Sequence, residues 1–185
     1  MTPTRAVPGG MLERDRTVLV VVDLQEAFRP VILGFDAVAG AIAKLLRAAR
    51  LLDLPAIVSE QHPRGLGPTA AELTELIVDA RRIEKRVFSA ARADAFDVGA
   101  RDQVLLCGIE THICVWQTGH DLLRAGHEVH VVRGAVSARS AGDHETGMLR
   151  LTAAGATPTS VETALFELML DADHPRFGDV QALVR

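Results

Sequence analysis

The chain has 185 residues, with 48% hydrophobic and 24% charged side chains, a composition typical of a globular protein with room for one domain. The formal net charge of -4 and the scattered basic residues argue against a nucleic-acid or membrane partner, because either would favour a basic patch. The sequence has no stretch of about 18 uncharged apolar residues, so no membrane span is expected. Two cysteines are too few for a disulfide framework, which predicts a reducing, cytoplasmic location.

Short apolar segments along the chain predict six strands. Residues 1–15 come first and are expected to form a loose N-terminal arm, since they contain prolines and glycines and lack the apolar core of a signal peptide. Residues 17–22 (TVLVVV) are continuously apolar and mostly β-branched, which is typical of a strand buried on both faces of a parallel sheet. Further strands are expected at residues 56–59, 83–88, 103–107, 128–132 and 157–161.

Segments with helical spacing of apolar residues alternate with these strands. The alternation predicts an α/β fold, a single Rossmann-like three-layer αβα sandwich with a mostly parallel six-stranded sheet, as one domain over residues 1–185. Ligands of such sheets bind beyond the carboxyl ends of the strands. The expected helices cover residues 36–49, 69–77, 111–125, 140–154 and 162–170, with Asp36, Ser140 and a capping box of Thr69 and Glu72 at three of their starts.

Cys114 is the first candidate for chemistry. It lies in the segment 108–114 (GIETHIC), just inside the start of a predicted helix, where free N–H groups and the helix dipole favour a thiolate. The alternative is a buried structural cysteine, which is how we interpret Cys107 in the preceding strand. Position alone leaves both interpretations of Cys114 open.

Two charged residues accompany the predicted strands. Asp23 directly follows the first strand, where it can serve as a general base or cap the next turn. Lys85 lies between Ile83 and Val87, where it can stabilise a nearby carboxylate and thiolate or protect an edge strand from aggregation. Asp23 belongs to the same expected neighbourhood as Cys114, and Lys85 can join it from the third strand.

Three motifs in this sequence resemble the isochorismatase-like cysteine hydrolases. They are VVVDLQEAF (20–28), EKRVFSA (84–90) and LLCGIETHICV (105–115), of which the last is the most specific. The resemblance runs from about residue 17 to the C-terminal helix, and it is strongest to the isochorismatase-domain-containing proteins. It therefore covers nearly the whole chain.

The resemblance implies a set of site residues. An Asp–Lys–Cys triad would consist of Asp23, Lys85 and Cys114. The peptide bond between Ile109 and Glu110 would be cis, and the N–H groups of Glu110 and Cys114 would hold an oxyanion.

The resemblance also implies an activity. Asp23 would deprotonate Cys114, and hydrolysis of an amide or ureido C–N bond in a small molecule would pass through a thioester, without a cofactor. Relatives that resemble isochorismatase itself cleave a vinyl ether by acid catalysis from the same aspartate, so vinyl ether hydrolysis is the alternative. A non-catalytic binding or scaffold protein is a further alternative. The family's usual assembly predicts a homo-oligomer, a dimer or larger.

Candidate pocket residues come from the motifs and the loop after the second strand. Glu110 would either repel anionic substrates or bind an N–H group of the substrate. The other candidates for substrate binding are Gln25, Phe28, His62 and Ile109.

No metal is expected. Nicotinamidases of the same superfamily carry a metal site of one Asp and two His, and Glu60 and His62 fall near the first two ligand positions. No histidine follows until His112, so the third ligand is missing. Residues 65–70 (GLGPTA) also fit a dinucleotide-binding motif, but Pro68 removes an N–H group that a phosphate would need.

Overall fold

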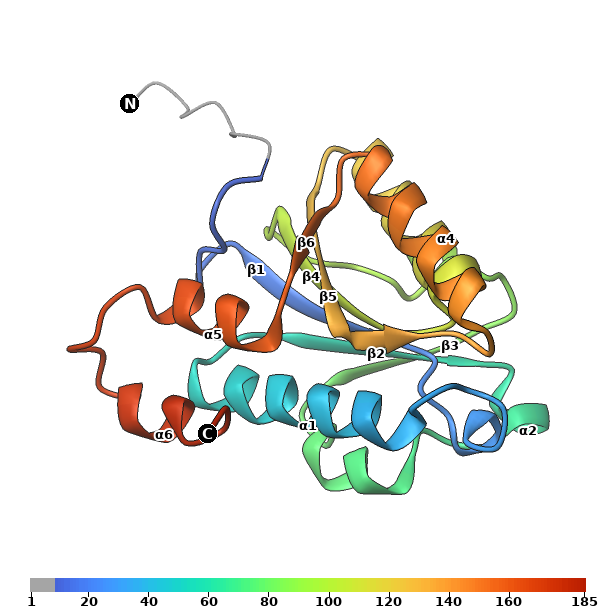
Figure 1. Ribbon diagram of the computed structural model, residues 1–185, viewed down its shortest axis with the longest axis horizontal. Helices are drawn as coiled ribbons and strands as arrows, with labels where there is room; N and C mark the ends of the chain where they lie inside the picture. The colour runs from blue at the N-terminus through green and yellow to red at the C-terminus, as the bar shows by residue number, and fades with distance from the viewer. Residues whose placement is uncertain (1–8) are drawn as a thin grey trace.

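The computed structural model describes residues 9–185 and contains the expected three-layer α/β sandwich (Figure 1). The strand order is β3-β2-β1-β4-β5-β6, and every strand pair is parallel, so the sheet is parallel throughout. The strands are β1 (Thr17–Val22), β2 (Ala56–Gln61), β3 (Arg81–Lys85), β4 (Gln103–Ile109), β5 (Glu128–Ser137) and β6 (Thr157–Thr159).

Helices cover both faces of the sheet, as Figure 1 shows for α1 and α5 on one side and α4 on the other. The side chains of β1 alternate between the two faces, so Leu19 and Val21 pack under α1 while Val18 and Val20 pack under α3 and α4. No helix among residues 9–185 is long and apolar enough to cross a bilayer. The helices are α1 (Phe35–Leu51), α2 (Pro63–Leu66), α3 (Trp116–Arg124), α4 (Ala141–Ala153), α5 (Val161–Met169) and α6 (Phe177–Gln181).

Several short turns join these elements. The 3-10 turns are η1 (Glu26–Phe28), η2 (Ala71–Leu76) and η3 (Ala90–Arg92), and the π-helical turn η4 (Thr111–Val115) precedes α3. The expected helix 111–125 is thus two elements. The third strand ends at residue 85 instead of 88, because the Lys85 ammonium group draws in the carbonyls of Val87 and Phe88 at 3.3 and 2.9 Å and turns the chain.

The predicted helix caps had mixed outcomes. Ser140 caps α4 as expected, with its Oγ accepting a hydrogen bond from the Asp143 N–H group at 3.1 Å. The prediction for Asp36 was wrong, because α1 begins one residue earlier with Gly34 as its N-cap at φ 61°. Asp36 lies in the first turn and pairs with Arg29.

The prediction of a capping box formed by Thr69 and Glu72 was also wrong. Both the N–H group and the hydroxyl of Thr69 donate to Glu60, at 2.8 and 2.7 Å. The following segment is the 3-10 turn η2, which has no side-chain cap. Thr69 therefore satisfies a buried carboxylate from β2, a tertiary contact that local sequence does not reveal.

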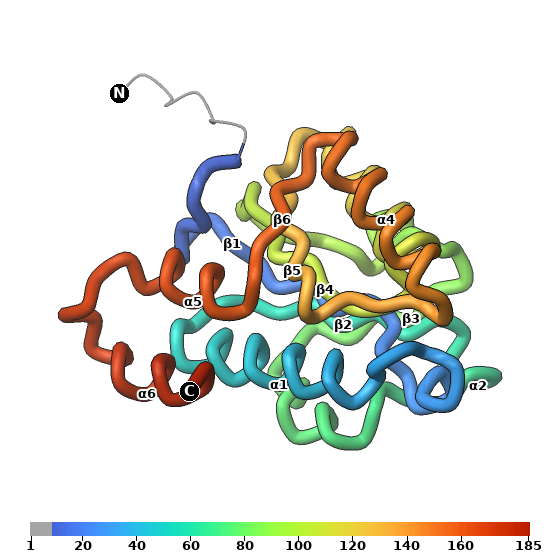
Figure 2. The backbone as a smooth tube through the Cα atoms, viewed as in Figure 1, coloured from blue at the N-terminus to red at the C-terminus, as the bar shows by residue number. Residues whose placement is uncertain are grey.

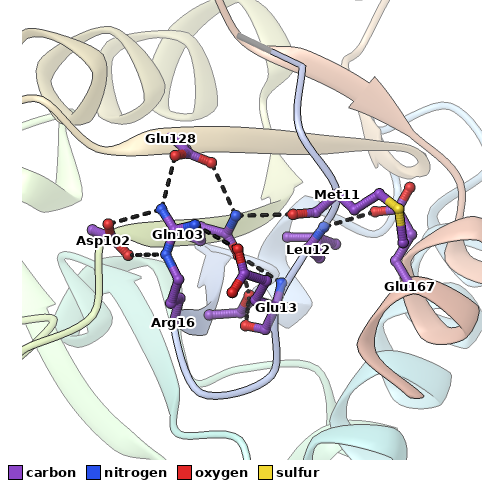
Figure 3. A network of polar contacts seen from close by, with 9 residues as sticks. Met11, Leu12, Glu13, Arg16, Asp102, Gln103, Glu128 and Glu167 are labelled. Carbon is purple, nitrogen blue, oxygen red and sulfur yellow. Dashed lines mark hydrogen bonds and ion pairs between the residues drawn. The ribbon is translucent and has the colours of Figure 1, made fainter. Parts of the chain in front are cut away.

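The expected loose arm lies partly outside the described residues, and the rest of it is not loose. Figure 2 traces this segment past α5 on its way to β1. Leu12 is fully buried, and its N–H group donates to Glu167 of α5 at 3.0 Å. The N–H group of Glu13 donates to Gln103 at 2.7 Å (Figure 3). Residues 11–13 are thus fixed to the body of the protein by a helix and a strand.

Gln103 is the centre of this network (Figure 3). Its amide nitrogen donates to the Met11 carbonyl at 3.0 Å and to Glu128 at 2.9 Å, while its oxygen accepts from Glu13 and Thr17. The side chain is fully buried, so no water can replace these bonds easily.

We expect Gln103→Ala to lower the free energy of unfolding by about 2–4 kcal/mol, because it leaves several buried polar groups without partners. Urea denaturation measures the change. Gln117→Ala, at a half-buried glutamine of α3, is the matched control and should cost less than about 0.5 kcal/mol. Equal losses in the two variants would contradict this role of Gln103.

Candidate active site

Asp23, Lys85 and Cys114 converge at the carboxyl edge of the sheet. Asp23 follows β1, Lys85 ends β3, and Cys114 lies in η4 just after β4. The Lys85 Nζ donates to Asp23 Oδ2 at 2.5 Å, with the two side chains 0% and 2% exposed. The Cys114 thiol lies close enough for both charged groups to act on its pKa, and it shares a cavity of about 220 Å³ with Asp23.

Neighbouring polar groups hold the ion pair. Asp23 accepts a hydrogen bond from the Ser59 hydroxyl at 2.7 Å, and its own N–H group donates to the Ser59 carbonyl at 3.1 Å. Lys85 also donates to Gln61 Oε1 at 2.7 Å. Burial raises the pKa of the Asp23 carboxyl, while Lys85 and Ser59 act in the opposite direction. The ammonium group is thus surrounded by acceptors and keeps Asp23 in one position.

The surroundings of Cys114 oppose the thiolate that the helix start was expected to favour. Burial and the negative charge of Asp23 raise the pKa of Cys114 to about 12, and Lys85 only partly compensates. Cys107 is a core residue as expected: its side chain is fully buried and burial raises its pKa further still. The two thiols therefore differ in their neighbours, because only Cys114 has an adjacent carboxylate and ammonium group.

Close backbone packing fixes the turn that carries Cys114. The peptide bond between Ile109 and Glu110 is cis. Gly108 has φ +115°, and a Cβ there would lie 2.0 Å from the Val22 carbonyl oxygen. At Gly147 of α4, a Cβ would lie 2.6 Å from the Thr111 carbonyl carbon. Only glycine permits these approaches, so β1 and α4 hold the segment 108–115 from two sides.

The cavity contains three of the five predicted substrate-binding residues. Phe28, Ile109 and Glu110 line it. It also contains residues that the sequence did not single out for this purpose. These are Gln61, Leu66, Phe88, Ile113 and Arg139.

Gln25 and His62, the other two predicted substrate-binding residues, do not line this cavity. The Gln25 amide is buried and is used by the backbone: it accepts from the Gln61 N–H group at 2.7 Å and donates to the carbonyls of Gln61 and Gly67. The His62 ring instead covers Gly65, and it borders a separate depression with Arg86. Both residues shape the loop after β2 from outside the cavity.

Glu110 has a partner that the sequence did not indicate. Its carboxylate accepts hydrogen bonds from the Arg139 side chain at 2.6 and 3.0 Å and from the Arg139 N–H group at 3.0 Å. Burial alone would raise the pKa of Glu110, but Arg139 outweighs it and the pKa is lowered. Arg139 comes from the loop between β5 and α4, and no motif marks it. Ser59 and Gln61 were more accessible to prediction, because they end a strand at the same edge.

The alternative cofactor sites find little support. Among residues 9–185, no group of three or more His, Cys, Asp or Glu side chains is arranged to hold a metal ion. Glu60 instead binds Thr69 and pairs with Arg82 at 3.2 Å. The glycine motif at residues 65–70 follows β2, whereas dinucleotide-binding folds place theirs after the first strand.

Comparison with known proteins gives consistent matches over the whole chain. A family model described as "Isochorismatase domain" matches residues 17–163. The mouse isochorismatase domain-containing protein 2A is 39% identical over 100% of this chain and 90% of its own length. The structure of MAR1 ribonuclease from Caenorhabditis elegans has a TM-score of 0.91 and 38% identity, covering 95% of this chain and 92% of that chain. The YcaC protein of Escherichia coli, an octameric hydrolase of unknown specificity, shares the fold at a TM-score of 0.83 and 22% identity, over 97% of each chain.

Proposed function

This chain belongs to the isochorismatase family, and from that premise we propose that it is a cysteine hydrolase that cleaves a C–N bond in a small amide or ureido compound. The observation that supports the proposal is the buried Asp23–Lys85 ion pair beside the Cys114 thiol. A carboxylate beside a thiol can take its proton, and an adjacent ammonium group stabilises the charges that result.

In the proposed reaction, the Cys114 sulfur attacks the substrate carbonyl carbon while its proton passes to Asp23. The new C–S bond forms as the C=O π electrons move to oxygen, and the N–H groups of Glu110 and Cys114 hold that oxyanion. Collapse of the intermediate breaks the C–N bond, and the amine leaves with the proton from Asp23. Water then attacks the thioester carbonyl carbon and gives one proton to Asp23. The C–S bond breaks, the acyl group leaves as a carboxylic acid that keeps the water oxygen, and Asp23 returns its proton to the Cys114 sulfur.

The raised pKa of Cys114 suits proton transfer during attack better than a preformed thiolate. At neutral pH the thiol keeps its proton until the substrate arrives, because burial and Asp23 disfavour a second negative charge. Burial brings the pKa of Asp23 up from its ordinary range, which improves it as a base and as the acid for the leaving group. The positive charge of Lys85 balances the negative charge in both states, whether that charge is on Asp23 before the proton transfer or on the Cys114 sulfur after it.

The alternatives make different demands on the site. Vinyl ether hydrolysis needs the acid Asp23 and no nucleophile, and a scaffold needs neither. The name of the C. elegans structure raises RNA cleavage as another candidate. No observation in this site favours it, since the cavity of about 220 Å³ is smaller than typical ligand pockets and the chain carries a net charge of -4.

The test is a search for the covalent intermediate. The protein is mixed with small amides, ureido compounds or isochorismate, and the reaction is quenched in acid. Mass spectrometry then measures the mass of the peptide that contains Cys114. We expect turnover of an amide or ureido compound with an acyl group on Cys114. Turnover of isochorismate without an adduct would establish the vinyl ether alternative, and the absence of both would favour a scaffold.

The pH dependence of alkylation provides a separate prediction. Iodoacetamide should modify Cys114 faster as pH rises, up to the highest pH at which the protein stays folded, because the thiol pKa is about 12. In Asp23→Asn the rate should increase at neutral pH, since the charge that raises this pKa is gone while Lys85 remains. Cys107 should stay unmodified in both folded proteins. A slower reaction in Asp23→Asn would contradict the assigned electrostatics.

We also propose that the chain forms a homo-oligomer. Leu149 of α4 is 64% exposed and borders a depression with Met148 and Arg133, an apolar surface suited to burial between subunits. The octameric state of the E. coli relative supports the same expectation. Light scattering after size-exclusion chromatography tests it, and Leu149→Glu should weaken the assembly if α4 forms the interface.

A further inference from the structure

The charges around the cavity are arranged in neutral pairs. Asp23 is paired with Lys85, and Glu110 is paired with Arg139. The charged side chains among the lining residues are Asp23, Glu110 and Arg139, and each has its partner in one of these two pairs. A charged substrate would therefore enter without an opposite charge to receive it, and burying an unpaired charge is costly.

Lys85 has no hydrogen-bonding capacity left for a substrate anion. Its ammonium group has three N–H groups, and four acceptors lie within 3.3 Å, namely Asp23, Gln61 and the carbonyls of Val87 and Phe88. The side chain has 0% exposure, so a bound molecule would reach it only by displacing one of these partners.

The Glu110 carboxylate is neutralised in the same way. Arg139 binds it through both side-chain and backbone N–H groups, and Glu110 is 5% exposed while Arg139 is 59% exposed. The pair therefore presents a compensated dipole to the cavity. Loss of either partner would leave one uncompensated charge beside the nucleophile.

The rest of the wall is apolar and the space is small. Phe28, Leu66, Phe88, Ile109 and Ile113 supply this surface. The volume of about 220 Å³ lies below the roughly 300–1,000 Å³ typical of pockets for drug-sized ligands. Such a space favours a compact apolar body over a long or highly hydrated one.

From these observations we propose that the substrate is an uncharged amide with a compact apolar body, and that the Glu110–Arg139 pair determines the specificity against charged substrates. This rests on the proposed C–N hydrolysis and narrows it, because it excludes ureido acids and other carboxylates. It also disfavours isochorismate, whose two carboxylates would meet no free cation.

The test compares three amides of similar size: neutral 4-methylpentanamide, anionic succinamate and cationic 4-aminobutanamide. Succinamate has a carboxylate where 4-methylpentanamide has an isopropyl group, so the two differ in charge but hardly in shape. Binding is measured as protection of Cys114 from iodoacetamide, and hydrolysis as release of ammonia. The wild-type protein should prefer the neutral amide to succinamate by about tenfold or more in both.

Variants of the pair should shift this preference in opposite directions. Glu110→Gln leaves the positive charge of Arg139 without its partner. It should therefore raise the binding and hydrolysis of succinamate, relative to those of the neutral amide, by about tenfold. Arg139→Gln should favour 4-aminobutanamide instead, and the double variant should return toward the wild-type order. Arg92→Gln breaks a similar Arg–carboxylate pair, with Asp121, outside the cavity and should change neither ratio.

Each outcome separates the substrate class from the chemistry. Equal or better binding of succinamate by the wild-type protein would overturn the proposal, as would ratios that stay constant in both single variants. Failure of all three amides to protect Cys114 would overturn it too. Protection by the neutral amide without release of ammonia would uphold the substrate class and contradict the proposed hydrolysis. Melting temperatures of the variants show that each remains folded.

Discussion

Replacement of Cys114 by alanine is expected to lower kcat/KM for an amide by at least about 1,000-fold, because it removes the atom that forms the covalent intermediate. Cys107→Ala is the matched control: it removes a thiol seven residues away, from the core of β4. Its kcat per folded molecule should stay within about twofold of the wild-type value, with only a modest loss of stability. The measurement is ammonia release from an amide under single-turnover and steady-state conditions.

The same variant also separates the candidate reactions. If Cys114→Ala keeps a hydrolytic activity, that activity uses Asp23 without a nucleophile, as vinyl ether hydrolysis would. If Cys107→Ala loses as much activity as Cys114→Ala, the loss reflects disturbed packing on β4 and η4 and the nucleophile assignment is wrong. Circular dichroism spectra of both variants exclude unfolding as the cause.

Much of the fold could be predicted because its signals are local. The continuous β-branched run of β1 indicates a buried parallel strand, and the β-α alternation places Asp23 and Cys114 at one edge. The Ser140 cap also depends on a neighbour three residues away. Lys85 was expected inside a strand over residues 83–88, whereas the structure ends β3 at Lys85 and so places it at the same edge.

The remaining features depend on contacts between distant segments. Gln25 was expected in the pocket, but its side-chain amide forms hydrogen bonds with backbone groups of Gln61 and Gly67. The sequence does not show which partner a buried amide will have. Arg139 lies 29 residues from Glu110, in a loop without a recognisable motif. The thiol pKa of Cys114 was predicted in the wrong direction, because helix-start arguments omit burial and the charge of Asp23. Electrostatics at this site is a property of the assembled cavity.

Lys85 is expected to contribute more to stability than any surface ion pair, because its partner is buried. Lys85→Met would leave the Asp23 carboxylate without its cation, and breaking a buried pair in this way costs about 3–5 kcal/mol of unfolding free energy. The chain offers a matched control, since Lys44 on α1 is the other lysine and is only half-buried. Lys44→Met should change stability by less than about 0.5 kcal/mol.

The pH dependence identifies the cause of that loss. Lys85 lowers the pKa of Asp23, so its removal leaves burial to raise that pKa further. When the pKa of a carboxyl is raised in the folded state, the protein loses stability as pH rises, because the carboxyl ionises more readily in the unfolded chain than in the folded protein. The deficit of Lys85→Met should therefore be smaller at about pH 5 than at about pH 8 in urea denaturation. Adding Asp23→Asn should recover part of the deficit at the higher pH, since no buried charge is left unpaired. A deficit independent of pH, or a double variant less stable than Lys85→Met, would show that Lys85 acts through packing alone.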